Sequence, residues 1–300
     1  MLGEGKKLTV RKQAVVLMIA SALCFSVMQL CSGICSTIPA MEQIFFRNVI
    51  SIAMYVLVWK KGIPLLGTRA QQPMLLCWSL CGCLNVLCLF IAAKSGDQGS
   101  LMIIGRMSGF LVVILSVLLL GERAYPVQYG AVALALLGGV LTASPSGTLW
   151  NTPFTLCMAL LSSLFSALAS ICLGMLKNRI HALTVAMHFS VFSLVLSTPF
   201  LTVDFVLPTG MQWLALIGIG LSGGLGQLTQ MWAYERAPVG EINIYGYSGI
   251  LFSIVLGCVF LNEKLTWAAG LGGALVILAG VLSYQLVGND RPHRGRFKEE

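Results

Sequence analysis

Long apolar runs separated by short polar connections follow one another along the whole 300-residue chain. A helix needs about 20 apolar residues to cross the roughly 30 Å hydrocarbon core of a bilayer. Several connections carry proline or glycine, which mark helix ends. The pattern predicts an all-α membrane protein with ten transmembrane helices, at approximately 13–34, 42–59, 74–93, 100–120, 126–144, 152–176, 182–203, 212–234, 240–261 and 266–286.

Two of the apolar segments share one design. Met102–Arg123 and Ile242–Lys264 both begin with polar and small residues, continue as a long apolar stretch, and end in Gly-Glu-Arg or Asn-Glu-Lys. The glutamates of these endings, Glu122 and Glu263, lie about half a chain length apart. We therefore expect a repeated unit, with a first five-helix repeat at 13–144, a second at 150–286, and tails at 1–12 and 287–300.

The odd number of helices in this unit determines the polarity of the second copy. After five crossings the chain starts the second copy from the opposite side of the membrane, so the copies are inverted. Inverted repeats are typical of alternating-access transporters, whose site lies between the halves near the membrane midplane. We therefore expect two inverted five-helix repeats around a polar cavity. A duplicated bundle that serves only as a scaffold is the alternative.

Composition and charge agree with a membrane protein. Hydrophobic residues make up 57% of the chain and charged residues 10%, against roughly 25% charged in soluble domains. The net charge of +8 does not indicate nucleic-acid binding, because the basic residues lie in short loops and tails. Of the 19 Lys and Arg residues, 15 fall on the side of the two tails. The positive-inside rule then predicts cytoplasmic termini in a cell membrane.

The ten cysteines do not suggest a metal site or a cofactor. Nearly all lie inside predicted helices, and neither histidine nor carboxylate accompanies them at metal-ligand spacing. A buried cysteine usually behaves as a small hydrophobe. A disulfide between Cys31 and Cys35, near a helix end, stays open as an alternative.

The order of helices and their closing residues resembles a known family. Two five-helix repeats, Gly-Glu-Arg at 121–123, Asn-Glu-Lys at 262–264, the Gly-rich helices that follow, and Arg47 after Phe46 resemble the EamA family of the drug/metabolite transporter superfamily. The resemblance spans about 13–285 and implies a transporter without enzyme activity. The family often has a proline early in helices four and nine. This chain has Ser108-Gly109 and Ser248-Gly249 there, so any helix break has to come from glycine.

Two arginines inside predicted helices are the first candidates for chemistry. Each costs about 2.5–3.5 kcal/mol at the centre of a spanning helix. We therefore expect Arg47 and Arg106 to face a wet cavity, to pair, or to reach the surface. At 1.5 Å per residue they lie ~9 and ~10 Å inside the outer surface. Two guanidiniums at one depth suit a carboxylate, phosphate or sulfonate group, unless they reach lipid headgroups or Glu42 neutralises one of them.

Further polar residues in the helices complete the candidate site. Asn243 and Tyr247 lie four residues apart and so share a helix face, where they could contact an organic substrate or form an interfacial belt. Amides in lipid need partners, which makes Asn85, Gln227 and Gln230 candidates. The glycines at 222–226 favour close helix packing. Residues that could carry a proton are Glu42, His188 and Glu241.

These features predict a secondary transporter that moves a small anionic or zwitterionic metabolite by alternating access, with a counter-ion or exchange substrate and membrane lipids as further partners. No nucleotide-binding P-loop is seen in the sequence. The alternatives are an exporter of neutral amino acids or amphiphilic drugs, in which the arginines are structural, and a flippase for lipid-linked substrates. A further alternative is an intramembrane serine protease, because Gly246–Gly249 reads GxSG and His188 lies in another helix.

Overall fold

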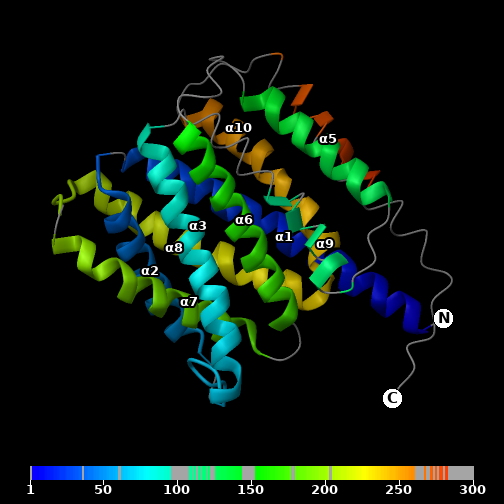
Figure 1. Cartoon of the computed structure of the whole chain (residues 1–300), viewed down its shortest axis with the longest axis horizontal. Coiled ribbons are helices and arrows are strands. Elements are labelled where there is room, and N and C mark those ends of the chain that lie inside the picture. The colour runs from blue at the N-terminus through cyan, green and yellow to red at the C-terminus, as the bar shows by residue number, and fades with distance from the viewer. Residues whose placement is uncertain are drawn as a thin grey trace.

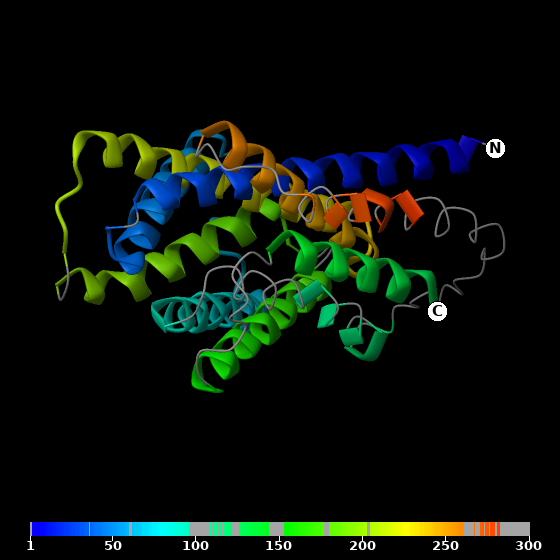
Figure 2. The ribbon, with the colours of Figure 1, turned by 90° about the horizontal axis from the view of Figure 1, so that it is seen from above.

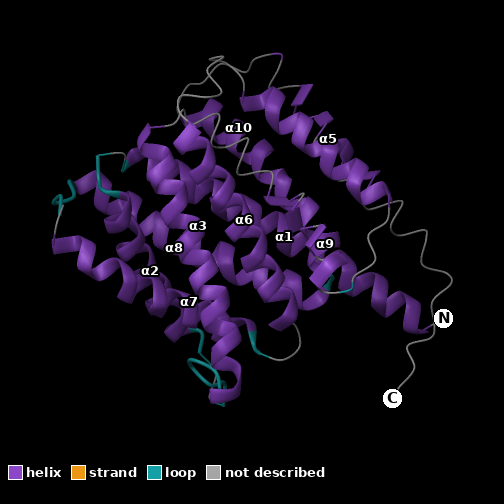
Figure 3. Cartoon of the chain, in the orientation of Figure 1, coloured by secondary structure: helices purple, strands orange, loops and turns teal. Residues whose placement is uncertain are grey.

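A computed structural model describes residues 2–35, 37–59, 62–95, 126–143, 153–176, 180–202 and 205–260, and parts of 108–121 and 267–282. The described residues form helices and connecting loops, with no strand among them (Figures 1 and 3). The α-helices are α1 (Leu2–Ile34), α2 (Ala40–Leu57), α3 (Gln72–Ser95), α5 (Pro126–Ala143), α6 (Pro153–Leu176), α7 (Ala182–Ser197), α8 (Gly210–Arg236), α9 (Val239–Ile242) and α10 (Ser248–Phe260). Short 3₁₀ helices are η1 (Arg69–Gln71), η2 (Thr198–Thr202) and η3 (Asn243–Tyr247).

Helix starts follow the signals in the sequence. Pro39 precedes α2, and Pro126 and Pro153 are the first residues of α5 and α6. Proline suits these positions because its fixed φ is helical and its missing N–H would have no partner there. At α8, Thr209 and Gln212 form a capping box. The predicted starts of these four helices therefore lie within about two residues of the observed starts.

The first helix begins earlier than the hydrophobic pattern indicates. α1 runs without interruption from Leu2 through the basic residues to Ile34. Its N-terminal turns extend beyond the neighbouring α10 in Figure 2. Lysine and arginine are good helix formers, so a basic segment ends the apolar stretch without ending the helix. The expected tail at 1–12 is thus helical from Leu2 onward, and it brings Arg11 into the bundle, where its side chain is only 8% exposed.

The segment predicted as one helix at 240–261 is divided into three. α9 forms a single turn, η3 continues as a tighter 3₁₀ helix, and α10 begins at Ser248. The 3₁₀ helix η3 gives way to α10 between Gly246 and Gly249, where the chain has no proline. This agrees with the expectation that a helix break in this segment comes from glycine. The Ser248 hydroxyl donates a 2.7 Å hydrogen bond to the Tyr245 carbonyl, a local bond that competes with regular helix geometry.

Equivalent helices of the two expected repeats pack reciprocally. α1 packs on α8, and α3 packs on α6, so the first helix of each repeat contacts the third helix of the other. α2 packs on α7, which pairs the two second helices with each other. α5 lies at the edge of the bundle (Figure 1). The centre of the molecule is therefore built from both halves of the chain.

The two second helices run in opposite directions. The Thr184 hydroxyl at the start of α7 donates a 2.8 Å bond to Pro64 O, beyond the end of α2. At the other end, Glu42 in the first turn of α2 accepts a 3.0 Å bond from Val206 N, after α7. Sequence-equivalent helices of opposite direction are what an inverted repeat requires.

Glycines on α8 let two neighbouring helices approach closely. A Cβ built on Gly220 would lie under 3.0 Å from Ile50 of α2, and one on Gly224 would lie 2.7 Å from Met54 Cε. The carbonyls of the same two glycines accept 3.0 Å bonds from Ser51 Oγ and Tyr55 Oη of α2. The predicted packing role of the glycine-rich stretch therefore agrees with these contacts.

Three helical segments among the described residues are long and apolar enough to cross a membrane, judged by length and composition. They are Val10–Ile34, Ala40–Leu57 and Ala182–Thr202. The total of ten spans stays a prediction, because much of 100–120 and 266–286 lies outside the described residues.

Candidate functional site

A cavity of about 190 Å³ lies between the two halves of the chain. Its first-half lining comes from α1 and from residues 108 and 109. Its second-half lining comes from α6, α8, η3 and α10. The lining residues are Met18, Ser21, Ala22, Phe25, Ser26, Gln29, Ser108, Gly109, Ser166, Ser170, Gln230, Asn243, Gly246, Tyr247 and Gly249.

Hydroxyl and amide groups dominate the polar part of this lining, and no charged side chain is among the described lining residues. Several serines donate to main-chain oxygens: Ser21 to Gly226 O at 2.7 Å, Ser26 to Gly249 O at 2.9 Å, and Ser170 to Ser166 O at 3.0 Å. These bonds explain how hydroxyls are accommodated in apolar helices. The cavity can therefore offer polar contacts to an organic molecule without a buried net charge.

Asn243 and Tyr247 lie together at the cavity, as their spacing predicts. Both belong to η3, so the division of the predicted ninth helix positions them. The Tyr234 hydroxyl of α8 donates a 2.9 Å hydrogen bond to Asn243 Oδ1 and so fixes the orientation of the amide. The NH₂ group of Asn243 is then the part of the amide that can donate to a substrate. Gly109 lies against the Tyr247 ring, where a Cβ would collide with the phenol. Asn243 and Tyr247 are thus held in place by neighbours from both halves.

Arg47 and Gln227 also meet, but outside this cavity lining. Arg47 Nη2 donates a 3.0 Å bond to Gln227 Oε1, and its guanidinium carbon lies 5.9 Å from the centroid of the Phe189 ring, within cation–π range. Gly223 makes room for this arrangement, because a Cβ there would lie 2.7 Å from Arg47 Nε. The charge of Arg47 is therefore met by an amide and an aromatic face. Glu42, considered as its counter-charge, instead accepts the Val206 N–H.

Asn85 lies at the α3–α6 contact and is not part of the cavity lining. The Ser162 hydroxyl of α6 donates a 2.8 Å bond to Asn85 Oδ1. The expectation that an amide in lipid needs a partner is met by the neighbouring helix. A single sequence cannot separate this use of an amide from substrate binding.

Two residues expected to carry protons have defined partners. His188 Nδ1 lies 2.9 Å from Ser79 Oγ, and Nε2 lies 3.3 Å from Gln72 Oε1, so the ring bridges α7 and α3. Glu241 Oε1 lies 2.7 Å from Arg11 Nε, and their side chains are 5% and 8% exposed.

The serine and histidine considered for a protease do not pair with each other. The Ser248 hydroxyl donates to the Tyr245 carbonyl, and His188 Nδ1 contacts the Ser79 hydroxyl. This arrangement does not assemble the serine–histidine pair of a protease.

Arg106 lies outside the described residues. The lining serines Ser21, Ser26, Ser108, Ser166 and Ser170, together with Gln29, were not among the site residues expected from the sequence. The only signal for them is that each is a polar residue within an apolar run. Gln230, considered beside Gln227, does line the cavity.

Comparison with known proteins reveals the same duplication. The model of the EamA-like transporter family matches residues 12–144 and again residues 153–285. The pseudopaline exporter CntI of Pseudomonas aeruginosa is 30% identical over 273 residues, which cover 89% of this chain and 94% of that protein. An uncharacterized transporter of Helicobacter pylori is 28% identical over 285 residues, covering 89% and 93%.

A solved crystal structure of a protein agrees in fold. It superimposes with a TM-score of 0.83 and 18% sequence identity, and it covers 93% of this chain and 98% of that chain. A helical membrane fold made of two repeats, with a polar cavity between them, is that of a multi-pass membrane transport protein. The chain belongs to the EamA-like transporter family.

Proposed function

We propose that the protein is a secondary transporter of the cytoplasmic membrane that carries a small anionic or zwitterionic metabolite through the cavity between its repeats. The observation that carries this proposal is the origin of the lining, which comes from α1 and residues 108 and 109 on one side and from α6, α8, η3 and α10 on the other. A site shared by two halves changes its exposure when the halves move against each other.

Alternating access is supported by the packing of the helices. Equivalent contacts recur as α1 on α8 and α3 on α6, and α2 and α7 run in opposite directions. The ten crossings and the cytoplasmic position of both termini follow from the hydrophobic runs and the distribution of basic residues. With this topology, the buried Arg11–Glu241 pair joins the two halves near the cytoplasmic side. The conformation described here is then closed on that side.

The size and chemistry of the cavity favour a small polar substrate. Pockets for drug-sized ligands measure about 300–1,000 Å³, so a cavity of 190 Å³ suits a smaller metabolite better than an amphiphilic drug or a lipid-linked substrate. Asn243, Tyr247 and Gln230 supply hydrogen-bonding groups and an aromatic surface. The sequence predicts one helix at 100–120, in which Arg106, three residues before the lining residue Gly109, would share the face of Gly109. A guanidinium there would bind the acidic group.

The direction of transport that we propose is export, because a relative with 30% identity is named an exporter. The alternative of a neutral amino acid as substrate keeps the same cavity but gives Arg106 no role in binding. For coupling, we propose exchange or a counter-ion, with Glu42, His188 and Glu241, the last of which pairs with Arg11, as the groups that could carry a proton.

Uptake into proteoliposomes tests the site and the substrate class together. We expect the purified protein to accept carboxylates or amino acids from a panel that also contains nucleosides. Asn243→Ala and Arg106→Gln are each expected to lower uptake of the accepted compound about 10-fold or more, since a hydrogen bond to a charged group contributes about 1.5–3 kcal/mol. For Arg106→Gln the loss should be confined to substrates with an acidic group.

The matched control is Asn48→Ala. It removes the same amide from a buried position on α2, where Nδ2 donates to Ile44 O, away from the cavity lining. Equal losses in Asn48→Ala and Asn243→Ala would contradict the assignment of the cavity. Unchanged uptake of every accepted anion by Arg106→Gln would remove the arginine from the binding site and favour the neutral substrate.

A further inference from the structure

Three cysteine thiols meet at the contact between α3 and α6. Cys77 and Cys81 lie four residues apart on α3 and share a face, while Cys172 reaches them from α6. The three Sγ atoms all lie within 4.8 Å of one another, and the Cys77–Cys172 separation is 3.7 Å. All three cysteines are free thiols. The pattern of residues along the chain does not predict this cluster, because Cys172 lies almost a hundred residues from its partners.

We propose that Cys77, Cys81 and Cys172 form a binding site for a soft metal ion, with Cu(I) as the best match. Metal–thiolate bonds are about 2.3 Å long, so three sulfurs around one ion form a triangle with edges of about 4.0 Å. The Cys77–Cys172 separation is 3.7 Å and the other two are at most 4.8 Å, so each edge needs to change by less than about 1 Å. Side-chain adjustments of that size bring the three atoms into trigonal coordination.

The donor set selects the kind of metal. Soft thiolate ligands favour Cu(I), Zn²⁺ and iron–sulfur clusters, whereas carboxylates and carbonyls suit Mg²⁺ and Ca²⁺. Structural Zn²⁺ sites almost always have four ligands in a tetrahedron, but the group found here has three. Cu(I) accepts three sulfur ligands in a plane. The site thus fits Cu(I) better than Zn²⁺.

Exposure provides a route to the site. Cys77 is exposed, Cys81 is half-buried and Cys172 is buried. Cys77 lies three residues from the start of the span expected at 74–93, which the positive-inside rule places on the cytoplasmic side, so an ion at that surface can meet Cys77 first and then move inward. The site joins α3 in the first repeat to α6 in the second. Because metal ligation in the folded state stabilises that state by mass action, occupancy is expected to raise the unfolding temperature.

A titration of the purified, reduced protein with Cu(I) under anaerobic conditions tests the proposal, with a chromophoric Cu(I) chelator as competitor. We expect one tightly bound Cu(I) per chain. Cys77→Ser, Cys81→Ser and Cys172→Ser should each lower the affinity at least about 10-fold, since even supporting residues around a metal cost 10–100-fold when they are mutated. X-ray absorption of the loaded wild-type protein should show three sulfur neighbours.

The matched control is Cys83→Ser on the same helix. Cys83 Sγ lies 3.4 Å from Ser193 Oγ of α7, away from the cluster, so this variant should bind Cu(I) like the wild type. The unfolding temperature of each variant without metal verifies folding. Unchanged affinity in all three cluster variants, an equal loss in Cys83→Ser, or fewer than three sulfur neighbours in the absorption spectrum would overturn the proposal.

Discussion

Replacing Glu241 by Gln is expected to lower the free energy of unfolding by about 3–5 kcal/mol, because it removes the carboxylate that lies against the buried Arg11 charge. The two groups lie 2.7 Å apart, and both side chains are less than one-tenth exposed. Unfolding in mixed detergent micelles measures the effect. The double variant Arg11→Met/Glu241→Met should recover most of the loss, since replacing a buried ion pair by apolar residues is often neutral.

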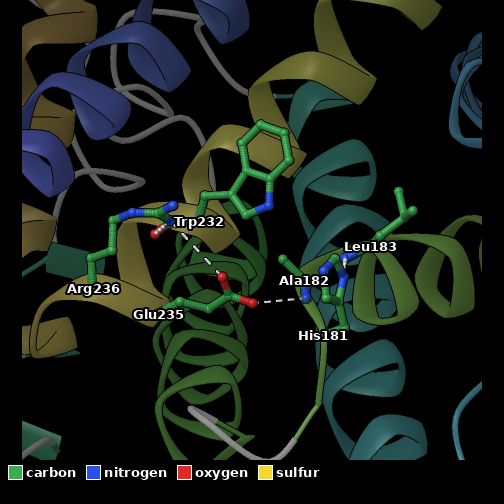
Figure 4. A network of polar contacts seen from close by, with 6 residues as sticks. All are labelled: His181, Ala182, Leu183, Trp232, Glu235 and Arg236. Atoms are coloured by element: carbon green, nitrogen blue, oxygen red, sulfur yellow. Dashed lines mark hydrogen bonds and ion pairs between the residues drawn. The ribbon is translucent and has the colours of Figure 1, made fainter. Parts of the chain in front are cut away.

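The control is the ion pair between Arg236 and Glu235 at the end of α8. Their nearest charged atoms are 3.9 Å apart and the side chains are about one-third exposed. Glu235 also accepts the Ala182 N–H at 2.8 Å, and Arg236 donates to Trp232 O at 2.7 Å (Figure 4). Arg236→Gln should cost less than about 1 kcal/mol. If Glu241→Gln is equally mild, the Arg11–Glu241 contact does not hold the two halves together.

Gly220→Val is expected to destabilise the protein by about 1–3 kcal/mol through overpacking between α8 and α2. A Cβ at Gly220 collides with the Cβ and Cγ2 atoms of Ile50, and the branched side chain of valine adds further contacts on the same side. Relief requires the helices to separate, which would also weaken the 3.0 Å bond from Ser51 Oγ to Gly220 O. Thermal unfolding in detergent provides the measurement.

Gly130→Val separates this packing effect from the general effect of valine in a helix. Gly130 lies in α5, and nothing is found within 4 Å of a Cβ built there. The variant should unfold close to the wild-type temperature. Equal destabilisation at the two positions would mean that close approach of α2 and α8 is not what Gly220 provides.

Helix positions were the most predictable feature, since apolar length and proline act locally. Pro39, Pro126 and Pro153 stand at helix starts in the structure. The predicted start of α1 was wrong because hydropathy indicates whether a residue lies in lipid or in water, and it does not indicate whether the backbone is helical. Arg11 was therefore assigned to a tail, although its charge is buried against Glu241.

The composition of the site was harder to predict, because it depends on which helices meet. Asn243 and Tyr247 could be paired from their spacing alone, and both line the cavity. Gln227 and Asn85 are the same kind of residue, but neighbouring helices satisfy them with Arg47 and Ser162. Local sequence does not say whether an amide will face a cavity or another helix. The cysteine cluster could not be predicted for the same reason, since it forms only where α3 and α6, which come from different repeats, pack against each other.

The central claim is that the cavity between the repeats opens alternately to the two sides of the membrane. Ser166 of α6 lines that cavity, and a cysteine there differs from serine by one atom. The test uses a background variant in which the native cysteines are replaced by serine and which still transports. Ser166→Cys is introduced into this background, and the protein is treated with a membrane-impermeant maleimide from either side of the membrane. Leu225→Cys, on the exposed face of α8, controls for labelling at the lipid surface. The account predicts labelling of Ser166→Cys from both sides and protection by substrate, whereas labelling from one side only, unaffected by any transported compound, would contradict it.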